Sequence, residues 1–136
     1  MLKDMFVAGA EQRETPLREK IEATVRTYLA SYEAGDIEGR LQLFAPDASF
    51  EDPVGTPAMV GHAALREFFA QVGGLPTKGK LRHLSVNGHE AAMLFDITIF
   101  GERYDKATVT VAETMVMDDE GRFKSLRAFW DRNSIS

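Results

Sequence analysis

The sequence lacks several residue types on which common kinds of functional site depend. It contains no cysteine and only three histidines among 136 residues, which excludes disulfides and thiolate zinc sites and argues against a His-rich metal centre. No apolar run approaches the ~20 residues that a membrane-spanning helix needs. The balance of 16 Lys and Arg against 21 Asp and Glu gives a net charge of −5, which argues against binding to nucleic acid or to an anionic membrane.

What remains is the composition of an ordinary soluble domain, with 44% hydrophobic and 27% charged residues. The apolar patch near the start is too short for the core of a signal peptide. We therefore expect a cytoplasmic protein in which residues 1–13 form a loosely held arm and residues 14–136 a single domain. Its chemistry must come from carboxylates, hydroxyls and shape, so we expect no metal and no organic cofactor.

The first half of the chain has the apolar spacing of helices. Thr15-Pro16 is typical of a helix start and Gly35 of a helix end. We predict further helices from Asp36 to about Phe44 and over 63–72, with a short extended run over 48–52 between them. Six residues form one helical stripe between Pro16 and Gly35: Leu17, Ile21, Val25, Tyr28, Leu29 and Tyr32.

The second half reads as strands joined by turns at Asn87-Gly88 and 119–121. Helices followed by an antiparallel meander predict an α+β fold, in which a curved sheet packs on three N-terminal helices. Such a sheet leaves an apolar cone that is a natural pocket for a small molecule. The four predicted strands are 81–87, 91–100, 107–117 and 123–131.

Glu113 interrupts the apolar face of a predicted strand, between Val111 and Met115. A buried carboxylic acid avoids the cost of an unpaired charge by staying protonated, and it is then a hydrogen-bond donor at neutral pH. The alternative is an edge strand or a bulge that turns Glu113 toward water. Alternation alone leaves both interpretations open.

Two further polar residues fall on apolar faces. Asp52 shares the side of Phe50, whereas Glu51 should face the opposite way. Asp52 is either an ordinary Asp-Pro turn opener or a partly desolvated base at the mouth of the cone. Tyr28 lies on the helical stripe, where its hydroxyl needs either a neighbouring side chain or a ligand.

Three stretches in the same order resemble bacterial Δ5-3-ketosteroid isomerases, within the wider SnoaL-like, nuclear-transport-factor-2-like (NTF2-like) fold of a cone-shaped, curved antiparallel or mixed sheet. They are Tyr28–Asp36, Pro46–Gly55 and Asp119–Trp130, and the resemblance extends over about residues 16–132. It implies the isomerisation of a 3-oxo-Δ5-steroid to the conjugated Δ4 form through a dienolate. It also implies a homodimer packed sheet to sheet.

The resemblance assigns the general base to Asp52 and the two oxyanion donors to Tyr28 and Glu113. In this enzyme type an Asp base acts beside an oxyanion hole formed by a Tyr and a protonated Asp. Here Glu113 is one methylene longer than the aspartate of the family, and Phe44 and Phe69 stand where some members have tyrosines. The resemblance further implies apolar steroid contacts from five residues: Phe68, Met93, Phe95, Leu126 and Trp130.

Two other functions fit the same fold. One is a SnoaL-like cyclase or an epoxide hydrolase of the limonene-epoxide type, which needs an Asp-Arg-Asp arrangement. Arg103 and Arg127 are available, but nothing in the sequence sets them against Asp52. The other is a non-catalytic small-molecule binding module, which would not need a base and a protonated acid in one pocket.

Overall fold

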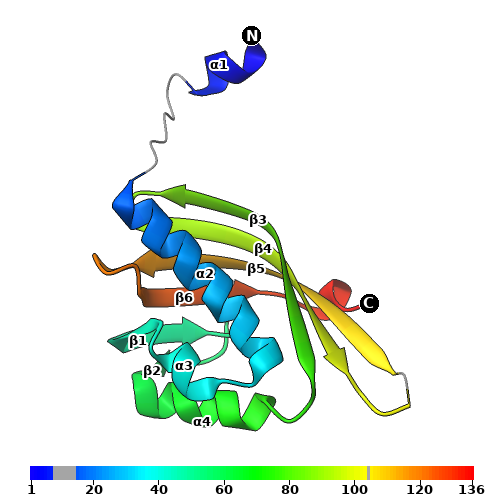
Figure 1. Ribbon diagram of the computed structural model, residues 1–136. Helices are drawn as coiled ribbons and strands as arrows, with labels where there is room; N and C mark the ends of the chain where they lie inside the picture. Colours follow the sequence, from blue (N-terminus) through cyan, green and yellow to red (C-terminus); the bar gives the residue numbers. More distant parts are fainter. Residues whose placement is uncertain (8–14, 104) are drawn as a thin grey trace.

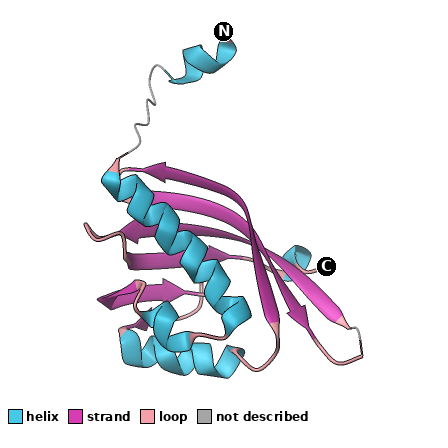
Figure 2. Cartoon of the chain, viewed as in Figure 1, coloured by secondary structure: helices cyan, strands magenta, loops and turns pink. Residues whose placement is uncertain are grey.

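A single mixed sheet, bent around helices on its concave side, dominates the computed structural model (Figures 1 and 2). The structure describes residues 1–7, 15–103 and 105–136. All neighbouring strands are antiparallel except β1 and β6, which are parallel. The predicted α+β class with a curved sheet is therefore confirmed. In spatial order the strands are β2 (Met59–Val60), β1 (Phe44–Glu51), β6 (Phe123–Phe129), β5 (Lys106–Met117), β4 (Glu90–Phe100) and β3 (Thr77–Asn87).

The long helix α2 (Pro16–Ala34) lies across the concave face of the sheet (Figure 1). It begins and ends where the sequence predicts. The Thr15 side chain accepts a hydrogen bond from the Arg18 backbone N–H, and Gly35 takes the left-handed conformation with φ of 65°. The shorter helices are α1 (Leu2–Val7), α3 (Ile37–Leu41), α4 (His62–Val72) and the 3₁₀ turn η1 (Arg132–Ser134). Of the expected arm, residues 8–13 lie outside the described residues.

The predicted second helix is too long, because it ends at Leu41 and Phe44 already belongs to β1. Phe44 pairs with Phe123 of β6, and this tertiary pairing overrides the local helical pattern. Pro46 lies where the β1–β6 register shifts between Phe44 and Ser49, a position at which a strand tolerates the missing N–H.

The strand β3 begins at Thr77, four residues earlier than predicted. The sequence around Gly79 is typical of a flexible connection. In the structure this segment pairs with the end of β4, and Gly79 lies opposite Ile97. A Cβ on Gly79 would come within 3.3 Å of both Ile97 and the Leu29 carbonyl. The glycine therefore lets β3 pack closely against α2, which closes one wall of the cone.

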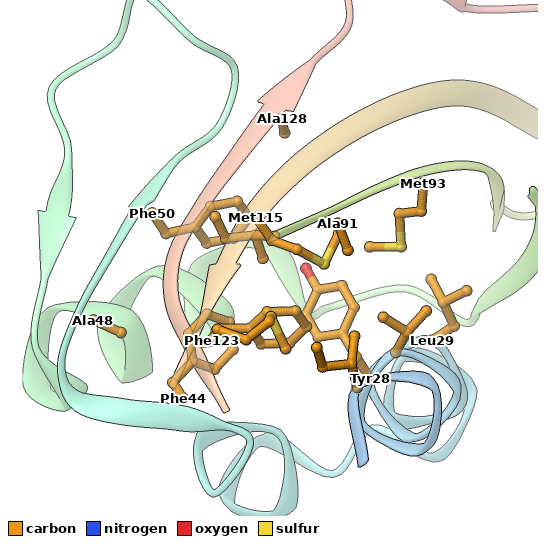
Figure 3. Close-up of a cluster of buried hydrophobic side chains, with 14 of the residues drawn as sticks. Tyr28, Leu29, Phe44, Ala48, Phe50, Ala91, Met93, Met115, Phe123 and Ala128 are labelled. Atoms are coloured by element: carbon orange, nitrogen blue, oxygen red, sulfur yellow. The ribbon is translucent and has the colours of Figure 1, made fainter. Parts of the chain in front are cut away.

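Aromatic rings fill one end of the cone, as the cluster in Figure 3 shows. Tyr28, Phe44 and Phe123 are fully buried, and their ring centroids lie 5.0–6.1 Å apart. Pairs of this kind add about 0.5–1.5 kcal/mol beyond the area they bury. This dry end of the cone fixes α2 against β1 and β6 and leaves the other end to hold the cavity.

Candidate active site

A cavity of about 240 Å³ opens where β4 ends and β5 begins. Its walls are mostly apolar, and the five other lining residues come from five separate parts of the chain. The apolar lining residues are Phe68, Val72, Phe95, Ile97, Ile99, Val109 and Val111; the remaining ones are Tyr32, Asp52, Thr77, Glu113 and Trp130. A mainly apolar cavity with a few convergent polar groups is typical of a small-molecule site.

Asp52 directly follows β1 and lines this cavity. Phe50, two residues earlier, is buried in the core. The Trp130 indole Nε1 donates a hydrogen bond of 2.6 Å to Asp52 Oδ1. Burial raises the pKa of the half-buried Asp52 carboxyl, and the indole hydrogen bond opposes part of that rise. The carboxylate is therefore a stronger base than one in bulk water.

Glu113 is only 3% exposed and points into the same cavity from the middle of β5. Its strand neighbours in register are Met93 and Ala128, and its Oε2 atom is buried with no hydrogen-bond partner among the described residues. Burial first, and the nearby negative charge of Asp52 second, raise the pKa of Glu113 well above its usual range. The raised pKa favours the protonated form of Glu113, which has a hydrogen-bond donor free for a ligand.

Tyr28 and Tyr32 lie one turn apart on α2, and their hydroxyl oxygens are 2.7 Å apart in a hydrogen bond. Tyr28 is completely buried, with its hydroxyl inside the cluster of apolar side chains in Figure 3, whereas Tyr32 lines the cavity. Burial raises the pKa of both tyrosines, and the Glu113 carboxyl adds to the rise. Both hydroxyls are therefore protonated and neutral.

Arg40 is an unusual buried cation beside the tyrosine pair. It is 4% exposed, and its guanidinium donates to the Ser31 hydroxyl at 2.8 Å and to the Ser31 carbonyl at 3.2 Å. The guanidinium carbon lies 4.0 Å from the centroid of the Tyr32 ring and 4.7 Å from that of Phe69. Two aromatic faces thus offset part of the desolvation of this charge.

The structure brings together most, but not all, of the residues that the sequence singles out. Asp52, Glu113, Phe68, Phe95 and Trp130 line the cavity. Tyr28, Met93 and Leu126 are each at most 3% exposed and are not among its lining residues. The roles assigned to all these residues on substrate stay predictions.

Sequence reasoning missed Tyr32, Arg40 and most of the apolar wall. The signal for Tyr32 was present, because it is four residues from Tyr28 on the same helical stripe. The sequence also held evidence for the apolar wall, because side chains at every second position of β4 point to the same face, and Phe95 and Ile99 both lie on that face. Arg40 had no signal, because its burial depends on how α3 packs.

The arrangement needed for an epoxide hydrolase of the limonene-epoxide type is not formed by the described residues. Arg127 pairs with Glu51 at 2.6 Å, on the side of β1 opposite to Asp52, and Arg103 is exposed in a turn. The described ranges also contain no group of three potential metal-ligating side chains. Within the same ranges, no helix combines the length and hydropathy required to cross a bilayer.

Comparisons with known proteins show the family of this chain and its fold. A sequence profile of the SnoaL-like domain matches residues 25–126. A steroid Δ-isomerase of Nocardioides simplex is 33% identical over 112 residues, which is 82% of this chain and 89% of that protein. The epoxide hydrolase LasB of Streptomyces lasalocidi is 58% identical over 38 residues, which is 28% of this chain but 14% of that protein.

A solved structure shares the fold. It is that of SalBIII, an epoxide hydrolase/cyclase-like enzyme with a role in forming a pyran ring of the polyether salinomycin. The two structures superpose with a TM-score of 0.80 at 24% identity, over 88% of this chain and 96% of that one. The cone-shaped sheet with its helices is thus common to both.

Proposed function

This chain belongs to the SnoaL-like domain family, and we propose that it is a steroid Δ-isomerase that moves the double bond of 3-oxo-Δ5-steroids into the conjugated Δ4 position. The relatives it matches are enzymes, which supports catalysis rather than binding alone. One observation carries the proposal. A desolvated carboxylate, Asp52, and a protonated carboxylic acid, Glu113, line one apolar cavity.

In this reaction Asp52 accepts a proton, whereas Glu113 donates a hydrogen bond. Asp52 removes a proton from the carbon between the ketone and the double bond, and the electron pair of that C–H bond moves toward the ketone oxygen to form a dienolate. Glu113 donates a hydrogen bond to this oxygen, as does the tyrosine pair, in which the resemblance assigns the role to Tyr28. Each such donor is typically worth about 3–4 kcal/mol in the transition state.

Asp52 completes the reaction by returning the proton two carbons further along, which yields the conjugated enone and restores the carboxylate. The Trp130 indole holds Oδ1, and the second carboxylate oxygen remains for the substrate. The apolar walls from β4 and β5 limit the contact of the half-buried carboxylate with water. Both proton transfers use the same carboxylate within one mostly apolar cavity.

A second candidate function is an epoxide hydrolase or cyclase. It is favoured by the 38-residue match to LasB and by the fold shared with SalBIII. In that reaction Glu113 would protonate an epoxide oxygen as the ring opens, and Asp52 would take a proton from the attacking hydroxyl or water. The isomerase has the stronger support, because the steroid isomerase matches 82% of this chain.

The assay for isomerase activity uses 5-androstene-3,17-dione and follows the rise of enone absorbance. We expect turnover by the wild-type protein and its loss in Asp52→Asn, which keeps the size of the side chain but removes the base. The unfolding midpoint of the variant is the control for intact folding. Absence of turnover by the wild type, together with opening of an epoxy-alcohol substrate, would replace the isomerase by the second candidate.

We also propose a homodimer that forms through the outer face of the sheet. Leu94 on β4 and Phe129 on β6 are 37% and 42% exposed there, and both lie opposite Ala112 of β5 in the strand register, so that they form one apolar patch. Light scattering of the purified protein is expected to give twice the chain mass of 15.1 kDa. A monomer over the micromolar range would contradict this.

A further inference from the structure

We propose that Tyr32, rather than Tyr28, is the hydroxyl that hydrogen-bonds the substrate oxygen, with Tyr28 and Arg40 acting behind it as positioning residues. This inference rests on the proposed isomerase function and names a further residue for it. Its first support is location. Tyr32 lines the cavity together with Asp52 and Glu113, whereas Tyr28 is completely buried and is not among the lining residues.

The hydrogen bonding of the pair gives the direction of donation. The two hydroxyls share one contact of 2.7 Å, and therefore one of their two protons lies between them. The edges and faces of Phe44 and Phe123 enclose Tyr28, with ring centroids at 6.1 and 5.3 Å. Among the described residues, the Tyr32 oxygen is the acceptor that the structure gives Tyr28, so Tyr28 donates and Tyr32 accepts.

This direction leaves the proton of Tyr32 for the cavity. Glu113 does not take it in the free protein, because Oε2 of Glu113 has no partner among the described residues. A hydroxyl that accepts one hydrogen bond becomes a stronger donor in the next, since the bonds of a chain polarise one another. A ketone oxygen that enters between Tyr32 and Glu113 thus meets one donor from each.

Arg40 contributes through the ring of Tyr32. Its guanidinium lies 4.0 Å from the ring centroid and is tied to α2 by two hydrogen bonds to Ser31. A positive charge at this distance stabilises negative charge that develops on the phenol oxygen as Tyr32 donates to an oxyanion. The same stacking holds the ring in one orientation, with its hydroxyl facing the cavity.

The experiment compares Tyr32→Phe with Tyr28→Phe, because each variant removes one phenol oxygen and both residues lie on the same helix. With 5-androstene-3,17-dione, Tyr32→Phe is expected to lower kcat by about 100- to 1,000-fold with KM changed less than 3-fold. Tyr28→Phe, which removes only the supporting bond, is expected to lower kcat by about 10-fold. Arg40→Met is expected to show a similar loss to Tyr28→Phe, with partial recovery in Arg40→Lys.

A second measurement separates electrostatics from packing. Equilenin is a phenolic steroid that imitates the dienolate, and its absorbance reports how much of the bound phenol is ionised at each pH. The pH at which bound equilenin ionises is expected to rise by about one unit in Tyr32→Phe and by less in Tyr28→Phe. A purely structural role for Tyr32 would weaken binding without moving this pH.

The outcomes separate this inference from the proposed function. Wild-type turnover with a larger loss in Tyr28→Phe than in Tyr32→Phe would overturn the assignment of Tyr32 and leave the isomerase intact. An unchanged kcat in a folded Tyr32→Phe variant would do the same. A wild-type protein that neither isomerises the dione nor binds equilenin would overturn the isomerase, and this inference with it.

Discussion

The indole Nε1 of Trp130 donates a 2.6 Å hydrogen bond to Oδ1 of Asp52 across 78 positions of sequence. The two residues meet because each directly follows a strand, and these strands, β1 and β6, are parallel neighbours in which Glu51 pairs with Arg127. The proton acceptor of the cavity is therefore fixed by the sheet register rather than by a flexible loop.

Trp130→Phe is expected to shift the acid limb of the kcat/KM profile to higher pH. The indole hydrogen bond favours the charged form of Asp52 and lowers its pKa, while burial raises it. Without this hydrogen bond, nothing opposes the effect of burial on the Asp52 pKa, which therefore rises. More of the base is then protonated at a given acidic pH. Profiles between pH 4 and 9 check this, with the opposite-face variant Phe129→Leu as the control. A limb that stays in place or moves to lower pH would count against the role of Trp130.

Glu113→Ala is expected to weaken the binding of equilenin by about 10-fold or more, because a buried donor to its phenol oxygen is lost. Glu113→Gln keeps a neutral donor of similar size and should retain most of the affinity. Fluorescence titration of the two variants beside the wild type measures the difference. Equal affinity in all three proteins would remove Glu113 from the oxyanion site.

The stability of the wild type is expected to decrease as the pH rises above the ordinary Glu113 pKa of 4.5. Below that pH the carboxyl is protonated in both folded and unfolded chains. Above it the unfolded chain ionises while buried Glu113 stays protonated, which favours unfolding by up to about 1.4 kcal/mol per pH unit until the raised folded pKa is reached. Asp52, whose pKa is also raised, acts in the same direction.

Urea unfolding of wild type and Glu113→Gln between pH 5 and 8 measures this effect. The variant has no carboxyl at position 113, so it should gain stability relative to the wild type as the pH rises. A constant difference between the two proteins across this range would mean that Glu113 is ionised in the folded state.

Ile97→Trp is expected to raise KM for the steroid at least 10-fold, because Ile97 lines the cavity and an indole would occupy part of its volume of about 240 Å³. Leu94→Phe is the control, since Leu94 lies on the outer face of the same strand and is 37% exposed. Steady-state kinetics of both variants check the prediction. A similar KM in Ile97→Trp and wild type would place the substrate outside this cavity.

Local rules drew attention to the acid and the base but did not decide their orientation. Alternation set Glu113 and Asp52 on apolar faces and left open an edge strand or bulge at Glu113 and a simple turn opener at Asp52, whereas the structure shows both lining the cavity. The helical stripe with Thr15 and Gly35 at its ends did predict α2. The same rules set Tyr28 and Tyr32 on one stripe and the resemblance selected Tyr28, because a stripe shows which face of a helix is buried but not how deeply each residue lies. Depth depends on the rings of Phe44 and Phe123, which tertiary packing brings to Tyr28.

The early start of β3 and the burial of Arg40 were beyond local rules for the same reason. Gly79 is part of a strand only because it pairs with β4 and packs against Leu29 of α2. Arg40 is buried only because Tyr32 and Phe69, from two other helices, form its two aromatic walls. Each of these features depends on partners distant in the sequence.

A crystal structure of the equilenin complex would test the convergence of Asp52, Glu113 and the tyrosine pair on one ligand most directly. In that complex the phenol oxygen is expected to lie within about 3 Å of both Glu113 and the Tyr32 hydroxyl. The free oxygen of Asp52 is expected to lie over the adjacent ring. A steroid bound outside the cavity, or with its phenol oxygen turned away from Glu113 and toward solvent, would contradict this convergence.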